Sequence, residues 1–273
     1  MLVASAPNGA YKTRRDHAAI PLTAGQLADT AAQVLQAGAR MLHLHVRDSS
    51  GRHTLDDHAY GAAIAAIRAR VGGQLLIQCT SEAAGIYAAA GQRRAVRRII
   101  SVDGVDGVSL AVRELAGSDA DAQAAGALFH RLAERSILAQ YILYSAADID
   151  HYAALRERDI IPAGRHSVLL VVGQRNAERS SVLDTLRRMA GALPAAVPWM
   201  ACAFGEHEFE CLTEATRLGG HVRVGFENSL RLRCGRAAAD NRQLVAQFTE
   251  SGNPHRRPLA DLRQARAALG GGP

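Results

Sequence analysis

Residues 21–48 contain one complete helix-and-strand unit, and their sequence reads PLTAGQLADTAAQVLQAGARMLHLHVRD. Thr23, followed three residues later by Gln26, is typical of a helix start in which each side chain bonds the backbone of the other residue. Gly38 suits the position just after the last helical turn, where a left-handed backbone favours glycine. Apolar residues then alternate over residues 40–46, which predicts a β-strand.

The same unit recurs along the chain. Strands are predicted at residues 2–6, 40–46, 74–80, 105–110, 137–143, 167–172, 197–203 and 222–225. Helices are predicted between Thr23 and Gly38 and at residues 57–70, 89–98, 119–134, 147–157, 178–190, 206–218 and 236–250. Eight strand–helix alternations within about 250 residues indicate an α/β fold of the (β/α)8 TIM-barrel type.

A doubly wound open sheet is the alternative architecture. Its dinucleotide-binding versions carry several glycines after the first strand, whereas residues 6–10 read APNGA and contain one. No break in composition interrupts the chain before its glycine-rich end, so we expect residues 1–273 to form a single barrel domain with a C-terminal helical extension. The residues after 250 are expected to close the outer wall of the barrel as a last helix.

The composition is that of a globular protein, with 48% hydrophobic and 21% charged residues. No run approaches about 18 apolar residues, so no membrane partner is expected. The net charge of +6 comes almost entirely from arginine, and only 4% of the residues are aromatic, which favours solvated arginines over nucleic-acid binding. Four cysteines without a C-x-x-C pair, and an N-terminus without a signal-peptide pattern, favour a reducing, cytoplasmic setting.

Lys12 is the only lysine in the chain. An aldolase that works through a lysine imine would therefore depend on Lys12 alone, because arginine does not form a Schiff base. We do not expect that chemistry here.

His43 and His45 are the sharpest candidates for chemistry. Side chains two residues apart on a strand share a face, so both imidazoles point the same way while Leu42 and Leu44 point the other. In a barrel the leucines would meet the helices and the histidines would face inward near the C-terminal mouth. Two converging imidazoles make half of a metal site. A pair of ordinary core or surface histidines is the alternative.

Glu227 follows the last predicted strand and falls at the same mouth. Two histidines and one carboxylate leave coordination positions open, as a catalytic zinc requires. A carboxylate at a helix start or in a surface ion pair is the alternative interpretation. Arg223 lies within the strand itself, and a guanidinium inside a barrel needs an anion, either a structural carboxylate or a bound substrate.

Five blocks of the chain resemble the β-keto acid cleavage enzymes, a family whose best-known member is 3-keto-5-aminohexanoate cleavage enzyme. They are residues 10–16, residues 20–23, residues 37–48 with their HLHVRD, residues 219–228 with GGHVRVGFEN, and residues 241–245, which are similar to the family's S-N-A-Q-L-V. The blocks follow the family's order over most of the chain, although residues 110–205 match poorly.

The resemblance implies a zinc-dependent (β/α)8 barrel that takes a β-keto acid and acetyl-CoA and returns acetoacetate and a new acyl-CoA. It implies zinc ligands at His43, His45 and Glu227 and an active-site arginine at Arg223. It further implies hydroxyls near the substrate carboxylate at Thr80, with Ser81 adjacent, and at Ser109. A homo-oligomer, with a tetramer suspected, is implied as well.

Several positions depart from the family pattern. Tyr11 stands where the aminohexanoate enzyme has the glutamate that holds the substrate's amino group, so we predict that 3-keto-5-aminohexanoate is not the preferred substrate. Asn228 replaces an aspartate that pairs with the arginine during proton transfer, and an amide cannot accept that proton. The acidic fifth-strand segment reads QYILY at residues 140–144, and the glycine-rich segment after the sixth strand reads VGQRN at residues 172–176.

The lost acids require a replacement base or a different reaction. Glu82 is a candidate base, because it places a carboxylate at the mouth of the third strand, and Glu206 and His207 after the seventh strand are further candidates. His53, in the loop after the second strand, is expected to be exposed. Two alternatives to β-keto acid cleavage stay open: a zinc-dependent barrel enzyme that performs hydrolysis or aldol cleavage, and a non-catalytic homologue that binds a metal and a carboxylate ligand.

Overall fold

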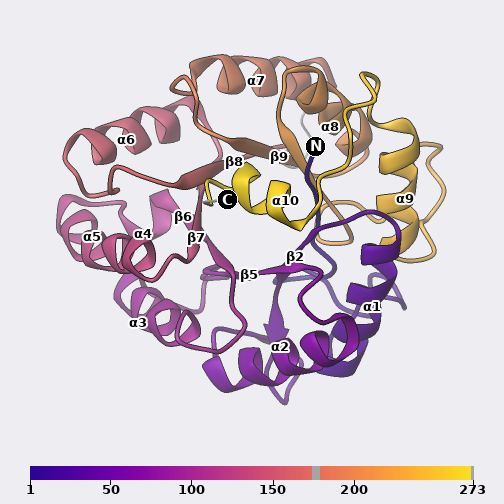
Figure 1. The fold of residues 1–273 in the computed structure, drawn as a ribbon, viewed down its shortest axis with the longest axis horizontal. Coiled ribbons are helices and arrows are strands. Elements are labelled where there is room, and N and C mark those ends of the chain that lie inside the picture. Colours follow the sequence, from indigo (N-terminus) through magenta and orange to yellow (C-terminus); the bar gives the residue numbers. More distant parts are fainter. Residues whose placement is uncertain (174–178, 272–273) are drawn as a thin grey trace.

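The computed structural model describes residues 1–173 and 179–271, and these residues form a closed barrel of eight parallel strands (Figure 1). The predicted TIM barrel is thereby confirmed. Part of the loop expected at residues 172–176 and the last two residues lie outside the described ranges. Around the barrel the strands follow the order β1, β10, β9, β8, β7, β6, β5 and β2.

The eight barrel strands lie close to their predicted positions. Their bounds are β1 (Val3–Ser5), β2 (Met41–Leu44), β5 (Leu76–Thr80), β6 (Gly107–Ala111), β7 (Leu138–Leu143), β8 (His166–Val172), β9 (Trp199–Ala203) and β10 (His221–Val224). The barrel closes at β1, where Ala4 is in register with Arg223 on one side and with Met41 on the other. This closure brings the motifs near residues 43 and 227 to neighbouring sectors of the same mouth.

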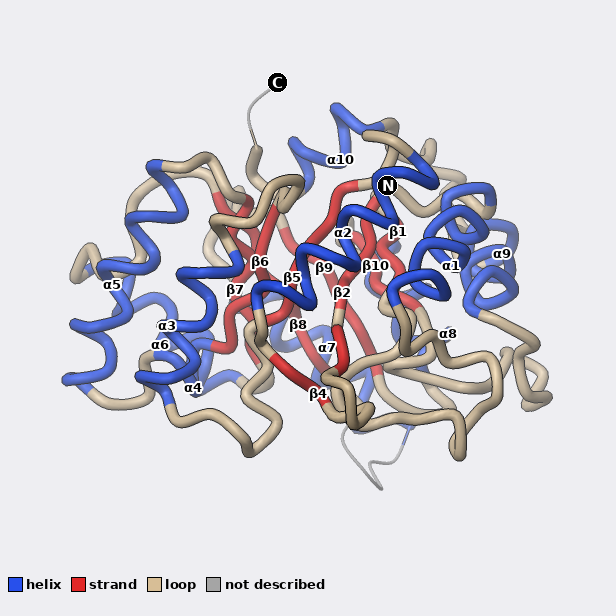
Figure 2. Tube along the Cα trace, turned by 90° about the horizontal axis from the view of Figure 1, so that it is seen from below, coloured by secondary structure: helices blue, strands red, loops and turns tan. Residues whose placement is uncertain are grey.

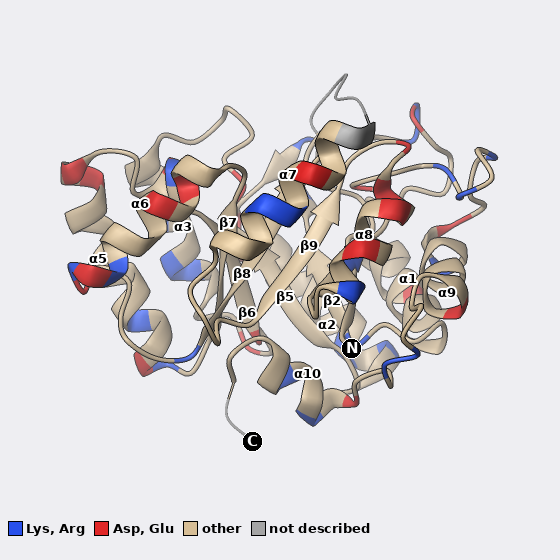
Figure 3. Ribbon diagram, turned by 90° about the horizontal axis from the view of Figure 1, so that it is seen from above, with Lys and Arg blue, Asp and Glu red and all other residues tan. Residues whose placement is uncertain are grey.

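Within the described residues, eight helices form the outer ring (Figure 1). They are α1 (Ala24–Gln36), α2 (Asp57–Val71), α3 (Ala89–Ile99), α5 (Asp119–Glu134), α6 (Ala146–Glu157), α7 (Arg179–Ala192), α8 (Glu208–Arg217) and α9 (Asn241–Ser251). The start predicted for the sixth of them, residue 178, lies outside the described ranges. Figure 3 shows basic and acidic residues distributed over these helices, and some pair between neighbours, such as Arg187 of α7 with Glu214 of α8 at 2.8 Å.

The start of α1 forms as the sequence predicts. The Thr23 side chain accepts a hydrogen bond from the backbone N–H of Gln26, and the Gln26 side chain accepts one from the backbone N–H of Thr23. Gly38 has a φ of +106°, and a Cβ there would lie 2.9 Å from Leu259. Both the backbone conformation and the close packing therefore favour glycine at this position.

Three short elements at the mouth were not predicted. Val46 leaves the barrel and pairs antiparallel with Thr54, so β3 (Val46–Arg47) and β4 (His53–Thr54) form a small hairpin. The helix α4 (Val112–Leu115) follows β6 directly. Alternation over residues 40–46 does not reveal the change of partner, because a strand keeps its side-chain period when it leaves one sheet for another.

The C-terminal segment lies across the N-terminal ends of the strands, and the prediction that it closes the outer wall is wrong. Figure 1 shows α10 (Leu262–Ala268) over the centre of the barrel, and Figure 2 places it at the end opposite β4 and the long loops. The backbone N–H of Ala260 donates to Met1 at 2.9 Å, and Ala265 and Leu269 pack with the apolar interior of the barrel. The outer wall is completed by α9, which packs on α1.

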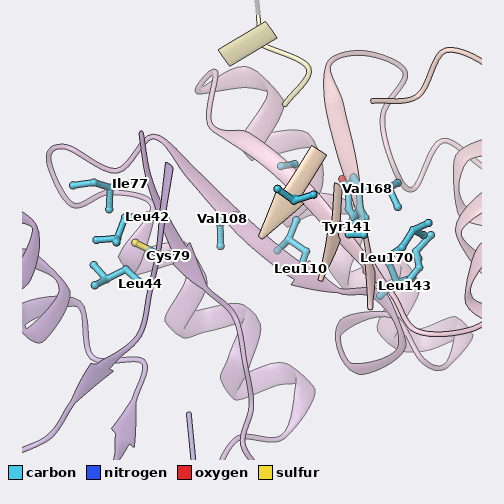
Figure 4. Packing of buried hydrophobic residues seen from close by; sticks show 14 of the residues in the cluster. Leu42, Leu44, Ile77, Cys79, Val108, Leu110, Tyr141, Leu143, Val168 and Leu170 are labelled. Atoms are coloured by element: carbon cyan, nitrogen blue, oxygen red, sulfur yellow. The ribbon is translucent and has the colours of Figure 1, made fainter. Parts of the chain in front are cut away.

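Two layers of buried side chains follow from the alternation of the strands. Leu42 and Leu44 of β2 pack beside Ile77 and Cys79 of β5 in the layer between strands and helices (Figure 4). Cys79 therefore serves as a small apolar side chain. Because the leucines face the helices, His43 must face the interior of the barrel. In residues 1–173 and 179–271, no helix combines the length and the apolar character that crossing a membrane needs.

Candidate active site

The side chains of His43, His45 and Glu227 converge at the mouth of the barrel. The two Nε2 atoms lie 3.1 Å apart, and they are 3.7 and 3.4 Å from Glu227 Oε2. Both histidines are only 2% exposed. Residues that are far apart in the sequence thus present three ligand atoms within 4.8 Å of one another.

The donor set fits a divalent transition metal. Glu227 Oε2 is buried and has no hydrogen-bond partner among the described residues, although it faces both imidazoles. Burial and the charge of Arg223 lower the pKa of His43 to about 3, so its imidazole is neutral and can act as a ligand. Burial alone would raise the pKa of Glu227, but Arg223 and the two histidines hold it well below its ordinary value. Two imidazoles and a carboxylate are a ligand set that zinc accepts.

A chain of amides across the barrel orients His43. Its Nδ1 lies 2.8 Å from Gln78 Oε1, Gln78 Nε2 donates to Gln140 Oε1 at 3.1 Å, and Gln140 Nε2 donates to Ser167 Oγ at 3.3 Å. Since the amide nitrogen of Gln78 donates to Gln140, its oxygen faces His43 and accepts a hydrogen bond from the Nδ1–H group. This tautomer leaves the Nε2 lone pair free at the mouth. We did not predict this chain, although polar residues at inward strand positions are its signal.

Arg223 lies within the barrel at the side of β10. It is 3% exposed, and its Nη2 donates to Glu227 Oε1 at 3.0 Å and to Cys202 Sγ at 3.3 Å. Its Nε is buried without a partner. The sequence predicts that a guanidinium here needs an anion. Glu227 supplies it in part through Oε1, while its Oε2 faces the histidines.

Two contacts hold the loop that carries Glu227. The ammonium group of Lys12 donates to the backbone oxygens of Phe226 and Glu227 at 2.8 and 2.6 Å. Gly9 has a φ of +66°, and a Cβ there would lie only 2.7 Å from Glu227 Cγ. The single glycine in the loop after β1 therefore makes room for a side chain of the triad.

Two adjoining cavities open above the triad. The inner cavity has a volume of about 340 Å³ and the outer one about 570 Å³. Both are lined by Tyr11, His45, Glu82, Phe204 and Glu227, so the triad lies at their boundary. The inner cavity is further lined by Thr80, Arg113, Glu114, Tyr144 and Arg223, and the outer one by the loop after β1, including Asn8, Lys12 and Asp16.

Helix α4 supplies part of the inner wall. Arg113 stacks over the ring of Tyr144 at 4.4 Å, and its Nε donates to Asp148 at 3.2 Å. Glu114 accepts a hydrogen bond from Gln92 at 2.8 Å, and burial together with the nearby charge of Glu82 raises its pKa. Arg113 and Glu114 were missed in the sequence, where the short helix that presents them has no clear periodicity.

The hydroxyl residues on β5 and β6 take different positions. Thr80 lines the inner cavity, and its Oγ1 accepts a hydrogen bond from the backbone N–H of Glu82 at 2.9 Å. Ser109 is in register with Thr80, and its buried hydroxyl has no partner. Ser81 is buried, also with an unpartnered hydroxyl, and neither serine lines the two cavities.

The departures from the family pattern lie at different depths. Tyr11 is 72% exposed at the rim, and its hydroxyl donates to Glu82 Oε1 at 3.4 Å. Asn228 is 3% exposed and does not line the two cavities, and in the part of the chain that the structure describes both atoms of its amide lack a partner. The Glu206 side chain is 82% exposed and that of His207 22%, and the two groups face each other at 3.7 Å. Of the three candidate bases, Glu82 alone lines these cavities.

His53 is buried, and the expectation that it is exposed is wrong. It is 5% exposed in β4, its ring lies 5.3 Å from that of His45, and its Nε2 bonds the backbone oxygen of Glu82. The hairpin that sequence analysis missed folds this imidazole over the triad.

The sequence profile of the β-keto acid cleavage enzymes matches residues 1–270. The chain belongs to this family. A 3-keto-5-aminohexanoate cleavage enzyme of Fusobacterium nucleatum is 24% identical over 98% of this chain and 97% of its own length. A 3-oxoadipate:acetyl-CoA acetyltransferase of Cupriavidus necator is 25% identical over 98% and 94%. The resemblance stated from the sequence motifs is confirmed, and the chain is an enzyme of the β-keto acid cleavage class.

Solved structures agree on the fold. ObcA in a ternary complex with a C4-CoA adduct and oxalate superposes with a TM-score of 0.71 at 16% identity, covering 92% of this chain and 67% of that one. The 3-dehydroquinate dehydratase of Geobacillus kaustophilus superposes with a TM-score of 0.60 at 14% identity, covering 92% of this chain and 91% of the other. At these identities the likeness is one of barrel architecture.

Proposed function

We propose that this enzyme is zinc-dependent and converts a small β-keto acid and acetyl-CoA into acetoacetate and a new acyl-CoA. The observation that carries the proposal is the convergence of His43, His45 and Glu227 at the boundary of two cavities, in a chain of this family. When bound there, zinc would act as a Lewis acid that stabilises negative charge developing on the keto oxygen.

The inner cavity is suited to the keto acid. Arg223 lines this cavity, where a substrate carboxylate would be a second anion for the buried guanidinium, which shares Glu227 with the two histidines. Thr80 lines the same cavity, so its hydroxyl would hydrogen-bond that carboxylate. Ser109 and Ser81 lie on the neighbouring strand and in the loop after β5, outside the cavity lining, and would support Thr80. Fixing the carboxylate at two points would orient the C2 protons toward the base.

Glu82 is the base that we propose for the C2 proton. Its carboxylate lines both cavities, and hydrogen bonds from Tyr11 and from the backbone N–H of Ala84 hold it in place. The resulting carbanion attacks the acetyl-CoA carbonyl, and CoA thiolate leaves. The thiolate then attacks the original keto carbon, and the bond from that carbon to C2 breaks. The acyl group ends on CoA, and the departing acetoacetate carbanion takes back the proton that Glu82 holds. Asn228 contributes a neutral amide where the family has an acid.

The outer cavity, between the loop of Lys12 and the loop of Glu227, is suited to the thioester arm of CoA. Its larger volume and its position above the triad would bring the acetyl carbonyl to the carbanion. The prediction that 3-keto-5-aminohexanoate is not preferred stays a prediction. It concerns Tyr11 alone, whereas Glu82 and Glu114 place two other carboxylates on the inner wall.

A panel of β-keto acids, each assayed with and without acetyl-CoA and with and without a chelator, tests the proposal. Acyl-CoA formed only with acetyl-CoA, and lost on chelation, supports it. Chelator-sensitive product without acetyl-CoA supports the alternative of hydrolysis or aldol cleavage. No product from any acid supports the non-catalytic homologue. The panel includes tails that are cationic, neutral and anionic, with 3-keto-5-aminohexanoate among the first group.

Zinc as the metal, a homo-oligomer with a tetramer suspected, and a cytoplasmic setting also remain proposals. Metal analysis of the purified protein and its mass in solution test the first two, and localisation of the tagged protein tests the third.

A further inference from the structure

The positive charge of the chain is concentrated on two loops at the mouth of the barrel. The first mouth loop is residues 10–19, after β1, and the second is residues 229–239, after β10. Together they contain one acid, Asp16, and six basic residues, which are Lys12, Arg14, Arg15, Arg231, Arg233 and Arg236. With histidines neutral, the two loops carry a net charge of +5, compared with +6 for the whole chain. Figure 3 shows basic residues on the loops that extend beyond α8 and α9, at the end of the barrel opposite α10.

The two mouth loops lie together beside the outer cavity. Leu232 of the second loop packs against the apolar cluster that contains Ile20, the residue that follows the first loop. In the first loop, Lys12 and Asp16 line the outer cavity, and the two arginines of this loop lie between them in the chain. The second loop follows β10, which lies between β9 and β1 in the barrel. Both loops therefore border the entrance to the outer cavity.

A tight turn directs the arginines of the second mouth loop into solvent. Arg231 and Ala237 form an antiparallel bridge, and Gly235 has a φ of +84° in the turn between them. Leu232 packs inward, so Arg231 and Arg233 on either side of it are exposed. The local fold of the loop thus places its guanidinium groups at the surface of the mouth.

The arginines of the mouth loops differ from those of the outer ring in having no acid as a partner. On α3, Arg93 donates to Asp121 and Arg98 donates to Asp57, both at 2.9 Å. In residues 1–173 and 179–271, none of the five mouth-loop arginines forms an ion pair with a carboxylate. The side-chain contacts of the second loop's arginines are with a backbone oxygen, a thiol and an aromatic ring. The mouth therefore presents positive charge that the fold does not neutralise.

CoA has its charge where these loops lie. Its phosphates, a diphosphate and a ribose phosphate, are at the end of the molecule remote from the thioester. If the thioester arm fills the outer cavity of about 570 Å³, the phosphates remain outside its entrance. Guanidinium groups stay charged at every physiological pH and bind phosphate oxygens in pairs, so unpaired arginines at this entrance match that end of CoA.

We propose that the two mouth loops form the binding site for the phosphates of CoA, with the five arginines as its phosphate ligands. This proposal rests on the proposed function, in which the thioester arm of CoA occupies the outer cavity. The loops would also attract the polyanionic co-substrate from solution, because their charge exceeds that of the remainder of the chain.

A comparison of two acetyl donors tests the proposal. Acetylpantetheine carries the same thioester arm as acetyl-CoA and lacks its nucleotide phosphates, so the wild type should have a lower KM for acetyl-CoA. Two double variants each remove two charges from one loop: Arg14→Ala with Arg15→Ala, and Arg233→Ala with Arg236→Ala. Each should reduce the ratio of the two KM values roughly 3–10-fold, as expected for two exposed ion pairs. Arg94→Ala with Arg97→Ala is the matched control, since it removes two exposed charges from α3 and should leave the ratio unchanged.

Binding of adenosine 3′,5′-bisphosphate, measured by calorimetry, makes the test independent of turnover. The wild type and the α3 control should bind it equally, each mouth-loop variant more weakly, and added salt should weaken binding. Cys234 in the second loop is exposed, whereas Cys79, Cys202 and Cys211 are buried. Bound bisphosphate should therefore slow the reaction of Cys234 with a thiol reagent.

Several results would overturn the proposal. They are equal KM values of the wild type for the two donors, equal bisphosphate affinity in the wild type and both mouth-loop variants, and no protection of Cys234 at saturating bisphosphate. A short DNA duplex that displaces the bisphosphate and binds more tightly would assign the loops to nucleic acid instead. Failure of the proposed function is distinguishable, because a protein that binds the bisphosphate at these loops but converts no acid of the panel keeps the site and lacks only the reaction.

Discussion

The two ends of the barrel are built from the same eight strands and differ in what they leave unsatisfied. At the N-terminal end, α10 covers the strands with Ala265 and Leu269, and the interior there is apolar. At the C-terminal end, Glu227 Oε2, Arg223 Nε and the amide of Asn228 are buried without partners. One end is closed by apolar packing within the chain, while the other gathers buried polar groups around the two cavities. Stability and chemistry are thus separated along the barrel axis.

The largest effect is expected at the triad. His45→Ala removes one of three ligands and should lower zinc affinity and activity by more than about 100-fold. The thermal midpoint of the metal-free protein should change little, because the unsatisfied end contributes little to stability. Zinc titration and kcat measure the first effect, and thermal unfolding with chelator measures the second. A large fall of the thermal midpoint would show that the residues of the mouth also stabilise the fold.

The corresponding experiment at the N-terminal end of the barrel, the closed end that α10 covers, replaces an apolar residue. Leu269→Ala leaves a cavity between α10 and the barrel interior and should lower the free energy of unfolding by about 2–3 kcal/mol, in the lower range for a buried leucine because α10 lies near the chain end. Urea unfolding measures this loss. Activity at 20 °C should stay within about two-fold, since substitutions away from the site leave the mouth geometry intact. A large loss of kcat without unfolding would contradict the separation of the two ends.

The amide chain below the triad should give a graded response. Gln78→Leu removes the acceptor for His43 Nδ1 and should weaken zinc binding roughly 10–100-fold. Gln140→Leu removes only the bond that orients Gln78 and should have a smaller effect, and Ser167→Ala the smallest. Zinc titration measures affinity, and the ¹⁵N shifts of His43 report its tautomer. If all three variants bind zinc as tightly as the wild type, the chain of amides does not orient His43.

The smallest of these effects concerns pH at the closed end. His221 Nδ1 accepts a hydrogen bond from the backbone N–H of Leu2 at 3.0 Å, so the ring must be neutral on that side. Burial, Arg257 and the N-terminus lower its pKa to about 4. The unfolded chain therefore binds the extra proton first, and stability falls as pH drops from about 6.5 toward 4.

His221→Gln should reduce this loss. Between pH 7.5 and pH 5 the fall in the free energy of unfolding should be smaller than in the wild type by about 1–2 kcal/mol. Urea unfolding at the two pH values makes the comparison. If both proteins lose the same stability, other groups dominate the acid sensitivity.

The barrel and the triad could be predicted from sequence because both depend on the two-residue alternation of side chains along short strands. Strand alternation places Leu42 and Leu44 outward and the histidines inward. Parallel strands bring their C-terminal ends together, so His43 and Glu227 meet although they lie 184 positions apart in the sequence. The capping pair Thr23 and Gln26 marked a helix start for the same reason, since its bonds are local.

What could not be predicted depends on contacts without a local pattern. The hairpin that buries His53, the turn of α4 that presents Glu114 and the place of α10 are set by which surfaces remain open once the barrel has closed. Glu208 stood next to two candidate bases in the sequence. The Glu206 side chain is exposed, whereas Glu208 is buried. The sequence at a helix start does not indicate which of its side chains faces the interior.

Lys12 gives this enzyme a chemical reporter of its own state. It is the only lysine, and its amine is engaged by the loop that carries Glu227. Apart from the chain terminus, an amine-selective acylating reagent has a single target, and modification requires that loop to release the nitrogen. The rate of labelling would therefore follow how often the loop opens, and a ligand that clamps the mouth would slow it, without any engineered probe.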